Sequence, residues 1–132
     1  MRYNMKGFTI IEIIIVVVIL SIITTLAIVS FSSFRQKKIL NTEVSKVISI
    51  INEARSKTLS SQYFSQYGVH FESSKLVLFK GTSYSVSSPN NATTTLSTAL
   101  EISGISLNGG GSDVVFQKLT GKTDNYGTIT VR

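Results

Sequence analysis

The apolar and polar positions divide the chain into three consecutive patterns, and the first is an almost unbroken apolar run. Residues 8–31 read FTIIEIIIVVVILSIITTLAIVSF, which is 24 residues with a single charge. A helix needs roughly 20 apolar residues to span a bilayer. A lone strand cannot satisfy its backbone groups in lipid, whereas a helix can. We therefore expect a membrane-spanning helix over 8–31, despite its many isoleucine and valine residues.

From residue 32 the pattern becomes that of an amphipathic helix. The apolar positions recur at spacings of three and four, which places them on one stripe. They are Leu40, Val44, Val47, Ile48, Ile51 and Ala54. No glycine or proline occurs between Gly7 and Gly68. We therefore expect one continuous helix from about Phe8 to about Ser60, roughly 80 Å long at 1.5 Å per residue.

After Ser60 the chain turns to serine, threonine, glycine and β-forming residues. Short strands are predicted at Val69–Phe71, Leu76–Phe79, Tyr84–Val86, Leu96–Ile105, Val114–Phe116 and Thr128–Val131. Hairpin turns are predicted at Glu72–Lys75 and Gly81–Thr82, a polar loop at Ser87–Thr95, and a flexible connection at Asn108–Asp113. The expected fold class is α+β, with a long N-terminal helix packed on a small antiparallel β-sheet domain.

Composition removes several classes of site. The chain has 132 residues, no cysteine and one histidine, His70, which excludes disulfides, thiolate sites and multi-histidine metal sites. The net charge of +6 lies mostly on the helix, because residues 32–60 hold six cations against two carboxylates. Residues 61–132 hold five cations against four carboxylates, so the high pI is weak evidence for nucleic-acid binding.

Glu12 is the informative residue of the apolar run. A carboxylate inside a membrane segment costs about 2 to 4 kcal/mol, so such residues are usually paired and functional. Phe8 lies four positions earlier and therefore on the same helical face. A cut after Gly7 would give Phe8 a free amine, which is largely cationic at neutral pH. That amine could pair with Glu12 of its own chain or of a neighbour.

Hydropathy alone leaves other interpretations open. Thr25-Leu26-Ala27 could serve as the cleavage site of a conventional secretory signal, the run could be an ordinary signal anchor, or it could be a buried helix. The orientation is also undecided. Arg2, Lys6 and the amino terminus on one side nearly balance the cations at 35, 37 and 38 on the other.

The segment Lys6-Gly7-Phe8-Thr9-Ile10-Ile11-Glu12, followed by the apolar run, resembles the class III signal sequence of type IV prepilins and pseudopilins. The resemblance implies that a prepilin peptidase cuts after Gly7 and N-methylates Phe8, and that Glu12 serves assembly by facing the amine of an adjacent subunit. It implies the divisions 1–7 leader peptide, 8–31 transmembrane and assembly helix, 32–60 amphipathic helix and 61–132 C-terminal β domain.

The same resemblance implies partners and a location. The partners are the prepilin peptidase, other pilin or pseudopilin subunits and an inner-membrane assembly platform. The location is the bacterial cytoplasmic membrane, single-pass with the C-terminal domain outside the cytoplasm, and then a filament in the periplasm or at the cell surface. No cofactor is implied. The single proline, Pro89, lies outside the apolar run, whereas many major pilins carry one within it.

Four short segments are similar to minor pseudopilins of the GspH/FimT family. They are Glu53-Ala54-Arg55-Ser56, Tyr67-Gly68-Val69-His70-Phe71, Phe116-Gln117-Lys118-Leu119-Thr120-Gly121 and Gly127-Thr128-Ile129-Thr130-Val131. This similarity implies a minor subunit at or near the tip of a type II secretion or type IV pilus filament. Two alternatives stay open. One is a DNA-uptake minor pilin that uses Lys118–Lys122 and the rings of Tyr63, Tyr67 and Tyr126. The other is a plain bitopic membrane-anchored domain.

Other candidate motifs have simpler explanations. His70 stands alone in a predicted strand, which indicates packing rather than catalysis. Gly121-Lys122-Thr123 lacks the upstream glycines of a phosphate-binding loop and is predicted to be a turn. Asn91-Ala92-Thr93 is a glycosylation triplet of a kind that arises by chance. Asp113 and Asp124 form no recognisable acid/base pair, and no nucleophile motif is present. We therefore expect a protein that is not an enzyme.

Overall fold

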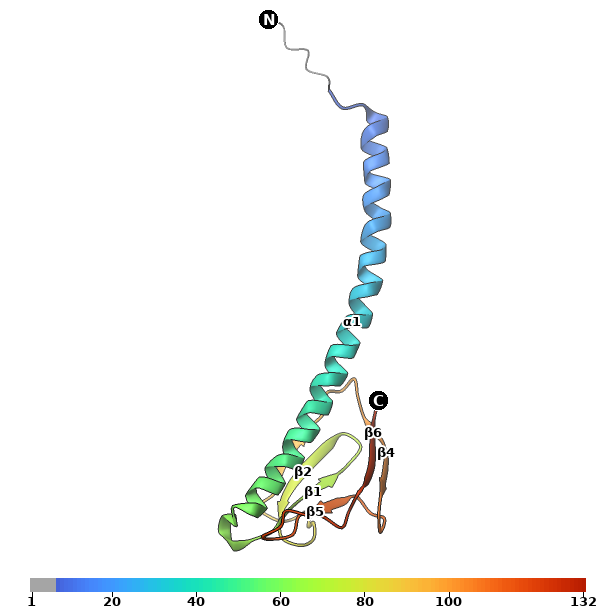
Figure 1. Ribbon diagram of the computed structural model, residues 1–132. Coiled ribbons are helices and arrows are strands. Elements are labelled where there is room, and N and C mark those ends of the chain that lie inside the picture. Colours follow the sequence, from blue (N-terminus) through green and yellow to red (C-terminus); the bar gives the residue numbers. More distant parts are fainter. Residues whose placement is uncertain (1–6) are drawn as a thin grey trace, which may run out of the picture. The chain divides into compact units, whose positions relative to one another are not determined.

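The computed structural model describes residues 7–132, without the side chains of residues 27–30 and 62 (Figure 1). The chain forms two units: unit 1 ends at Lys38, and unit 2 is Ile39–Arg132. Helix α1, Ile10–Leu59, runs through both. This confirms the single long helix expected from the absence of glycine and proline.

In unit 1, α1 is apolar on all sides and uncovered. It contains a candidate membrane span with a mean hydropathy of 3.0, none of it buried. The hydroxyls of Ser21, Thr24 and Thr25 each donate to a carbonyl four residues back: Ser21 to Val17 at 2.8 Å, Thr24 to Leu20 at 2.7 Å and Thr25 to Ser21 at 2.8 Å. These polar groups are therefore satisfied inside the helix, as a lipid environment requires.

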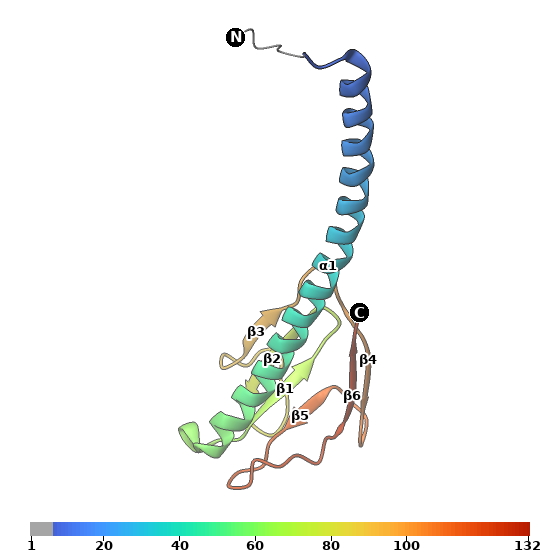
Figure 2. The same ribbon diagram turned by 45° about the horizontal axis from the view of Figure 1, so that its top comes forward.

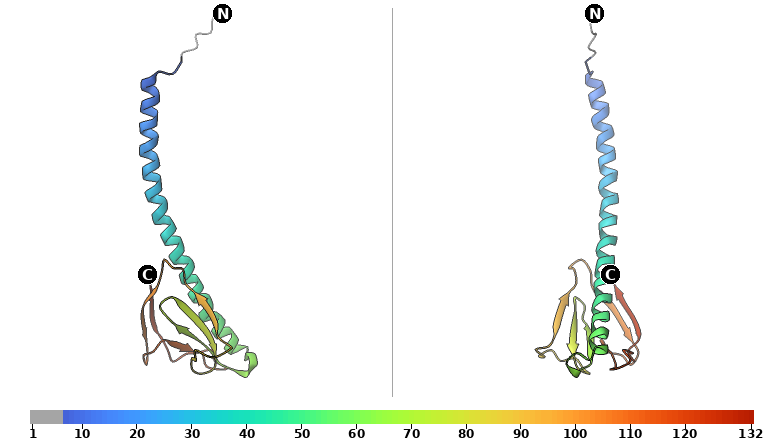
Figure 3. Two further views of the ribbon diagram at one scale, coloured as in Figure 1. Left: turned by 180° about the vertical axis from the view of Figure 1, so that it is seen from behind. Right: turned by 60° about the vertical axis from the view of Figure 1, so that its left-hand side comes forward.

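Unit 2 combines the second part of α1 with two antiparallel sheets. The strands are β1 (Tyr67–Phe71), β2 (Lys75–Lys80), β3 (Ala92–Thr95), β4 (Ile102–Leu107), β5 (Asp113–Val115) and β6 (Gly127–Val131). One sheet has the order β3-β2-β1-β5 and the other pairs β4 with β6 (Figure 2). The two sheets lie on either side of the helix segment of unit 2 in Figure 3, right. The α+β fold class is confirmed.

The helix face that covers the core differs from the predicted stripe. The buried positions are Glu43, Val47, Ile50, Ala54 and Thr58, again at spacings of three and four. Two members are polar, and this concealed the stripe in the sequence. The apolar members pack against Val69, Phe71, Leu76 and Leu78 of the first sheet.

The predicted stripe residues that do not reach this core line a groove instead. Leu40, Val44 and Ile48, with Ile51, face Ile129 and Val131 of β6 across a groove of about 590 Å³. Val44 and Ile48 therefore lie against unit 2, as the stripe predicted, but at this groove rather than in the buried core that Val47 and Ala54 reach.

Thr58 joins the end of α1 to the start of the sheet. Its side chain is fully buried. The hydroxyl donates to the carbonyl of Ala54 at 2.9 Å and accepts the backbone N–H of Tyr67 at 2.9 Å. Ala54 is also fully buried. A small residue at this position lets the helix lie close to the strands.

The strand predicted at Tyr84–Val86 is wrong. The position beside β2 is taken by β3, which lies inside the predicted polar loop, and its threonines pair with residues 75–77. β2 is buried on both faces, with Leu76 and Leu78 toward the helix. Tyr84 packs instead over the other face, where its ring lies 5.8 Å from that of Phe79. The segment after Gly81 therefore covers the sheet rather than extending it, and Gly81–Thr82 is not a hairpin turn.

The other β predictions hold with shifted bounds. The turn Glu72–Lys75 joins β1 to β2, and the strands at 114–116 and 128–131 correspond to β5 and β6. The strand predicted from Leu96 begins only at Ile102.

Left-handed backbone marks the exit from α1. Ser61, Tyr63 and Phe64 have φ values of 51°, 53° and 54°. Each such residue costs roughly 1 to 2 kcal/mol outside glycine. The turn carries Tyr63 and Phe64, whose side chains are 72% and 88% exposed.

We predict that unit 2 folds only with its part of α1. A fragment of residues 31–132 is expected to unfold cooperatively on heating, followed by circular dichroism. A fragment of residues 62–132 is expected to show no cooperative transition, because the sheet face around Val69 and Leu76 loses its cover and a small sheet is not stable alone. A cooperative transition in the shorter fragment would show that α1 is not needed for the core.

Candidate functional site

Gly7 and Phe8 lie ahead of the helix in exposed, non-helical backbone. No atom lies within 4 Å of the position that a Cβ on Gly7 would occupy. The fold of residues 7–132 therefore gives no reason for glycine here, and the constraint on this residue comes from outside the chain. Phe8 is 80% exposed, so the bond between Gly7 and Phe8 is open to a peptidase.

Thr9 and Glu12 form a capping box at the start of α1. The backbone N–H of Glu12 donates to Oγ1 of Thr9 at 3.3 Å, and the backbone N–H of Thr9 donates to Oε2 of Glu12 at 3.5 Å. The carbonyl of Thr9 accepts the N–H of Ile13 at 3.3 Å. This reciprocal pattern satisfies two N–H groups that a helix start leaves unpaired. Glu12 thus caps the helix, a role that the sequence analysis missed although the Thr-x-x-Glu spacing predicts it.

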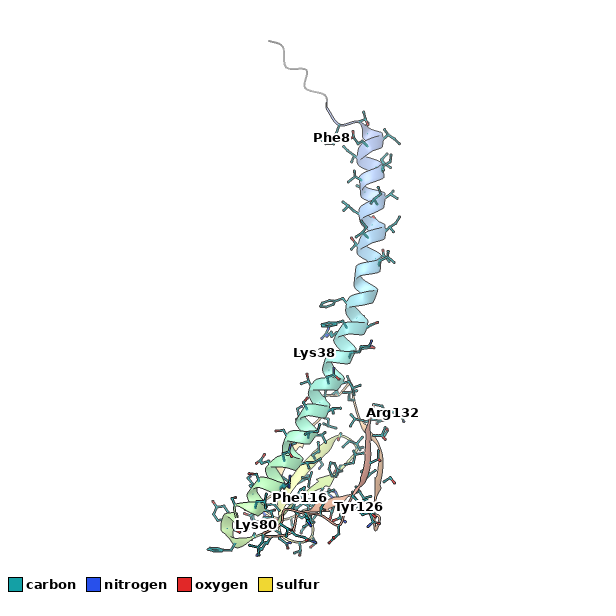
Figure 4. The ribbon with its side chains drawn as sticks, in the orientation of Figure 1. Phe8, Lys38, Lys80, Phe116, Tyr126 and Arg132 are labelled. Atoms are coloured by element: carbon teal, nitrogen blue, oxygen red, sulfur yellow. The ribbon has the colours of Figure 1, made fainter. Side chains whose placement is uncertain are left out.

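Phe8 and Glu12 share one face of the chain, as predicted. Together with Ile13, Val16 and Val17 they line one shallow hollow, and Figure 4 labels Phe8 at the start of the helix. Apolar side chains therefore lie beside the exposed carboxylate on this face. Among the ion pairs of residues 7–132, none involves Glu12, so its charge is balanced by no side-chain cation of the described chain.

Comparison with known proteins bears on this segment. Residues 2–28 match the prokaryotic N-terminal methylation motif. The chain carries a prepilin-type N-terminus. The match supports a type IV pilin-like protein that is processed by a prepilin peptidase and assembles with other pilins. With the candidate span in α1, it suggests a membrane-anchored pilin. No curated protein and no solved structure matches the chain.

The remaining polar residues singled out in the sequence serve unit 2 of this pilin-like chain. Nδ1 of His70 and Oδ1 of Asp113 lie 2.5 Å apart, which connects β1 to β5. The His70 ring also stacks on Tyr84, with centroids 3.9 Å apart and planes at 11°. Asp124 lies elsewhere and accepts from Gln117 at 2.7 Å. Among the described residues no cluster of three or more potential metal ligands occurs.

Gly121-Lys122-Thr123 lies at a turn, as expected. The backbone carbonyl of Gln117 accepts the N–H of Gly121 at 2.9 Å, and the backbone N–H of Gln117 donates to the carbonyl of Lys122 at 2.8 Å. Gly121 has φ +60°, which favours glycine. Of the three tyrosines considered for base stacking, Tyr67 is buried, whereas Tyr63 and Tyr126 are exposed.

We predict that Gly7→Val leaves uncut precursor in the membrane. The added side chain has room within the chain, so only recognition by the peptidase is disturbed. Intact-mass measurement of the membrane-bound protein gives the N-terminus directly. Ile11→Val, which changes a nearby side chain without touching the scissile bond, is expected to be cut normally. Normal cutting of Gly7→Val would remove Gly7 from the cleavage site.

Proposed function

We propose that the chain is a structural subunit of a pilin-like filament, cut after Gly7 and N-methylated at Phe8. The observation that carries this proposal is an exposed glycine–phenylalanine bond directly ahead of a capped, uncovered apolar helix, within a match to the methylation motif. In this role the chain is the substrate of a peptidase and not itself an enzyme. It acts by packing its apolar segment against those of other subunits.

Two charges, the amine that the cut creates at Phe8 and the carboxylate of Glu12, explain why the chain would need a neighbouring subunit. The cut creates an amine at Phe8, beside the N-terminal end of α1, where the helix dipole already disfavours positive charge. The carboxylate of Glu12 is the nearest compensating group, and it lies in apolar surroundings. An uncompensated charge inside a helix bundle costs several kcal/mol. Pairing the amine of one subunit with Glu12 of the next would neutralise both and set the axial register of assembly.

The capping box is compatible with this pairing. The cut leaves the peptide bond between Phe8 and Thr9 intact, so Thr9 keeps the N–H that Glu12 accepts. A carboxylate has two oxygens with about four acceptor positions. Oε2 can cap the helix while Oε1 meets a cation from outside.

Within this class we propose a minor pilin or pseudopilin of the GspH/FimT kind, in a type IV pilus or type II secretion filament. The segments that carry the resemblance are joined in unit 2. Nε of Arg55 donates to the carbonyl of Gly121 at 3.1 Å. Gly68 lies where a Cβ would fall 2.5 Å from the Phe79 ring and 2.8 Å from the carbonyl of Val114. These contacts give Arg55, Gly68 and Gly121 structural roles in unit 2, which supports the proposal.

We predict that assembly needs the charge of Glu12 rather than its capping hydrogen bond. Glu12→Ala removes both the charge and the cap, whereas Glu12→Gln removes the charge and keeps a side chain able to cap. Both are expected to reduce recovery of partner pilins in co-purification by roughly tenfold or more, because the neighbouring amine is left unpaired. Processing at Gly7 should continue in both.

Thr9→Ala is the matched control for the Glu12 variants. It removes the hydroxyl that caps Glu12 but keeps the carboxylate, at a cost of about 1 kcal/mol in helix stability. Near-normal recovery of partners with Thr9→Ala and loss with Glu12→Gln would establish the charge as the cause. Near-normal recovery with Glu12→Gln and loss with both Glu12→Ala and Thr9→Ala would assign Glu12 to helix capping alone.

A DNA-binding minor pilin is a second candidate, favoured by one local arrangement. Nζ of Lys80 lies 5.0 Å from the ring centroid of Tyr63, and Nζ of Lys118 donates to the carbonyl of Phe64 at 2.7 Å. Exposed rings beside cations are what single-stranded nucleic acid stacks on. The plain bitopic anchor has no comparable observation in its favour.

We predict that, if this second function holds, the mature chain in detergent retards single-stranded DNA in a gel and loses the interaction as salt rises. Tyr63→Ala should weaken binding several-fold, since one stacked base contributes about 1 to 3 kcal/mol. Val86→Ala, at an exposed apolar residue with no ring to stack on a base, is the control. The absence of retardation at low salt would leave the filament role alone.

A further inference from the structure

The end of the apolar segment in unit 1 carries a group of aromatic and basic side chains. We refer to Phe31, Phe34, Arg35, Lys37 and Lys38 as the collar. All five are exposed on α1, and the two rings are 70% and 68% exposed. Figure 4 labels Lys38 on the helix. Neither the methylation motif, which ends at residue 28, nor the core of unit 2 accounts for these residues.

The spacing gathers most of the collar on one side of the helix. Residues 31, 34, 35 and 38 follow the i, i+3, i+4, i+7 pattern of a single helical face. Two phenylalanines therefore come first along this face, and Arg35 and Lys38 follow. Cationic side chains that follow directly on an apolar run are typical of the border between the hydrocarbon and the headgroups of a bilayer, where they reach the headgroups.

The position along the helix agrees with this border. From Ile10 to Phe31 a helix rises about 32 Å, close to the roughly 30 Å of hydrocarbon in a typical bilayer. The remaining collar residues extend about 10 Å further, which spans the roughly 5 to 8 Å of headgroup on that side. With the start of α1 at one surface of the hydrocarbon, the collar lies in the headgroups of the other.

The collar also has a charge excess that the sequence does not balance locally. Between Ile13 and Thr42 the chain has three cations and no carboxylate. The next carboxylate on the helix, Glu43, is buried in unit 2 and held by Lys46 at 2.8 Å. Removal of the leader takes away Arg2 and Lys6, so the collar then supplies the cations that adjoin the span in the mature chain.

We propose that the collar binds the phosphate groups of anionic phospholipids and so fixes the depth at which the unassembled subunit sits in the membrane. This inference rests on the membrane-anchored part of the proposed function. A basic residue near an anionic surface favours it by about fivefold, so three give a preference on the order of a hundredfold over a neutral surface. The phenylalanines add apolar contact with the acyl chains at the same level.

The test uses the full chain in vesicles. The sequence contains no tryptophan, so Phe34→Trp provides a single fluorophore within the collar. The protein is reconstituted into phosphatidylcholine vesicles with or without phosphatidylglycerol, and quenching by lipids brominated near the glycerol end reports the depth of the ring. We expect severalfold stronger quenching with phosphatidylglycerol, and loss of that difference at high salt.

Charge variants identify the groups responsible. In the Phe34→Trp background, Arg35→Gln/Lys37→Gln/Lys38→Gln is expected to abolish the effect of phosphatidylglycerol. Lys75→Gln/Lys80→Gln/Lys122→Gln removes the same net charge from unit 2 and is expected to leave the effect unchanged. A collar variant that still responds to phosphatidylglycerol, or equal quenching of the parent protein in both vesicles, would overturn the proposal.

An alkaline carbonate wash tests the membrane-spanning role of residues 8–31 separately from the collar proposal. If the protein stays in both kinds of vesicle but quenching is equal with and without phosphatidylglycerol, only the collar proposal fails. If the wash removes the protein from both, the membrane-spanning role of residues 8–31 fails, and the collar proposal fails with it.

Discussion

The fold of unit 2 depends on the close contact between the last turns of α1 and the first strand. Ala54 has no side chain beyond Cβ and is fully buried, and the Thr58 hydroxyl bonds both the Ala54 carbonyl and the N–H of Tyr67. This pair of contacts fixes where β1 starts relative to the helix. β2 and β5 then pair with β1, and β3 pairs with β2, so the position of the whole first sheet follows from that one junction.

The long helix and its apolar part could be predicted because their signals are local and continuous. The buried helix face could not, because Glu43 and Thr58 lie on it and a polar residue counts against burial in any sequence pattern. Glu43 is tolerated there because Lys46 bonds both of its oxygens, at 2.9 and 2.8 Å. His70 and Asp113 are 43 residues apart, so their contact follows only from the strand pairing. At the proposed processing site, Gly7, Phe8 and Glu12 were predicted from the sequence, whereas the capping role of Thr9 was missed, although the Thr-x-x-Glu spacing indicates it.

Glu12 shows how one carboxylate can meet demands at two levels. Within the chain it completes the first turn of α1, and this contribution is local and modest. In the proposed assembly, the same side chain would present a charge between apolar helices, where its effect would be large because no solvent screens it. Helix capping and pairing with a neighbouring amine both need a negative group in the first turn of the helix, so one residue can serve both.

The left-handed turn after α1 has a consequence for which substitutions the chain would accept. A sequence optimised for folding alone would place glycine or asparagine at positions 61, 63 and 64, where φ is positive. The chain instead has Tyr63 and Phe64, whose rings point into solvent and add nothing to the core. The turn therefore holds exposed aromatic rings at a cost in stability that the core does not offset. It is the place in unit 2 where one replacement by glycine would both raise thermal stability and remove an exposed ring.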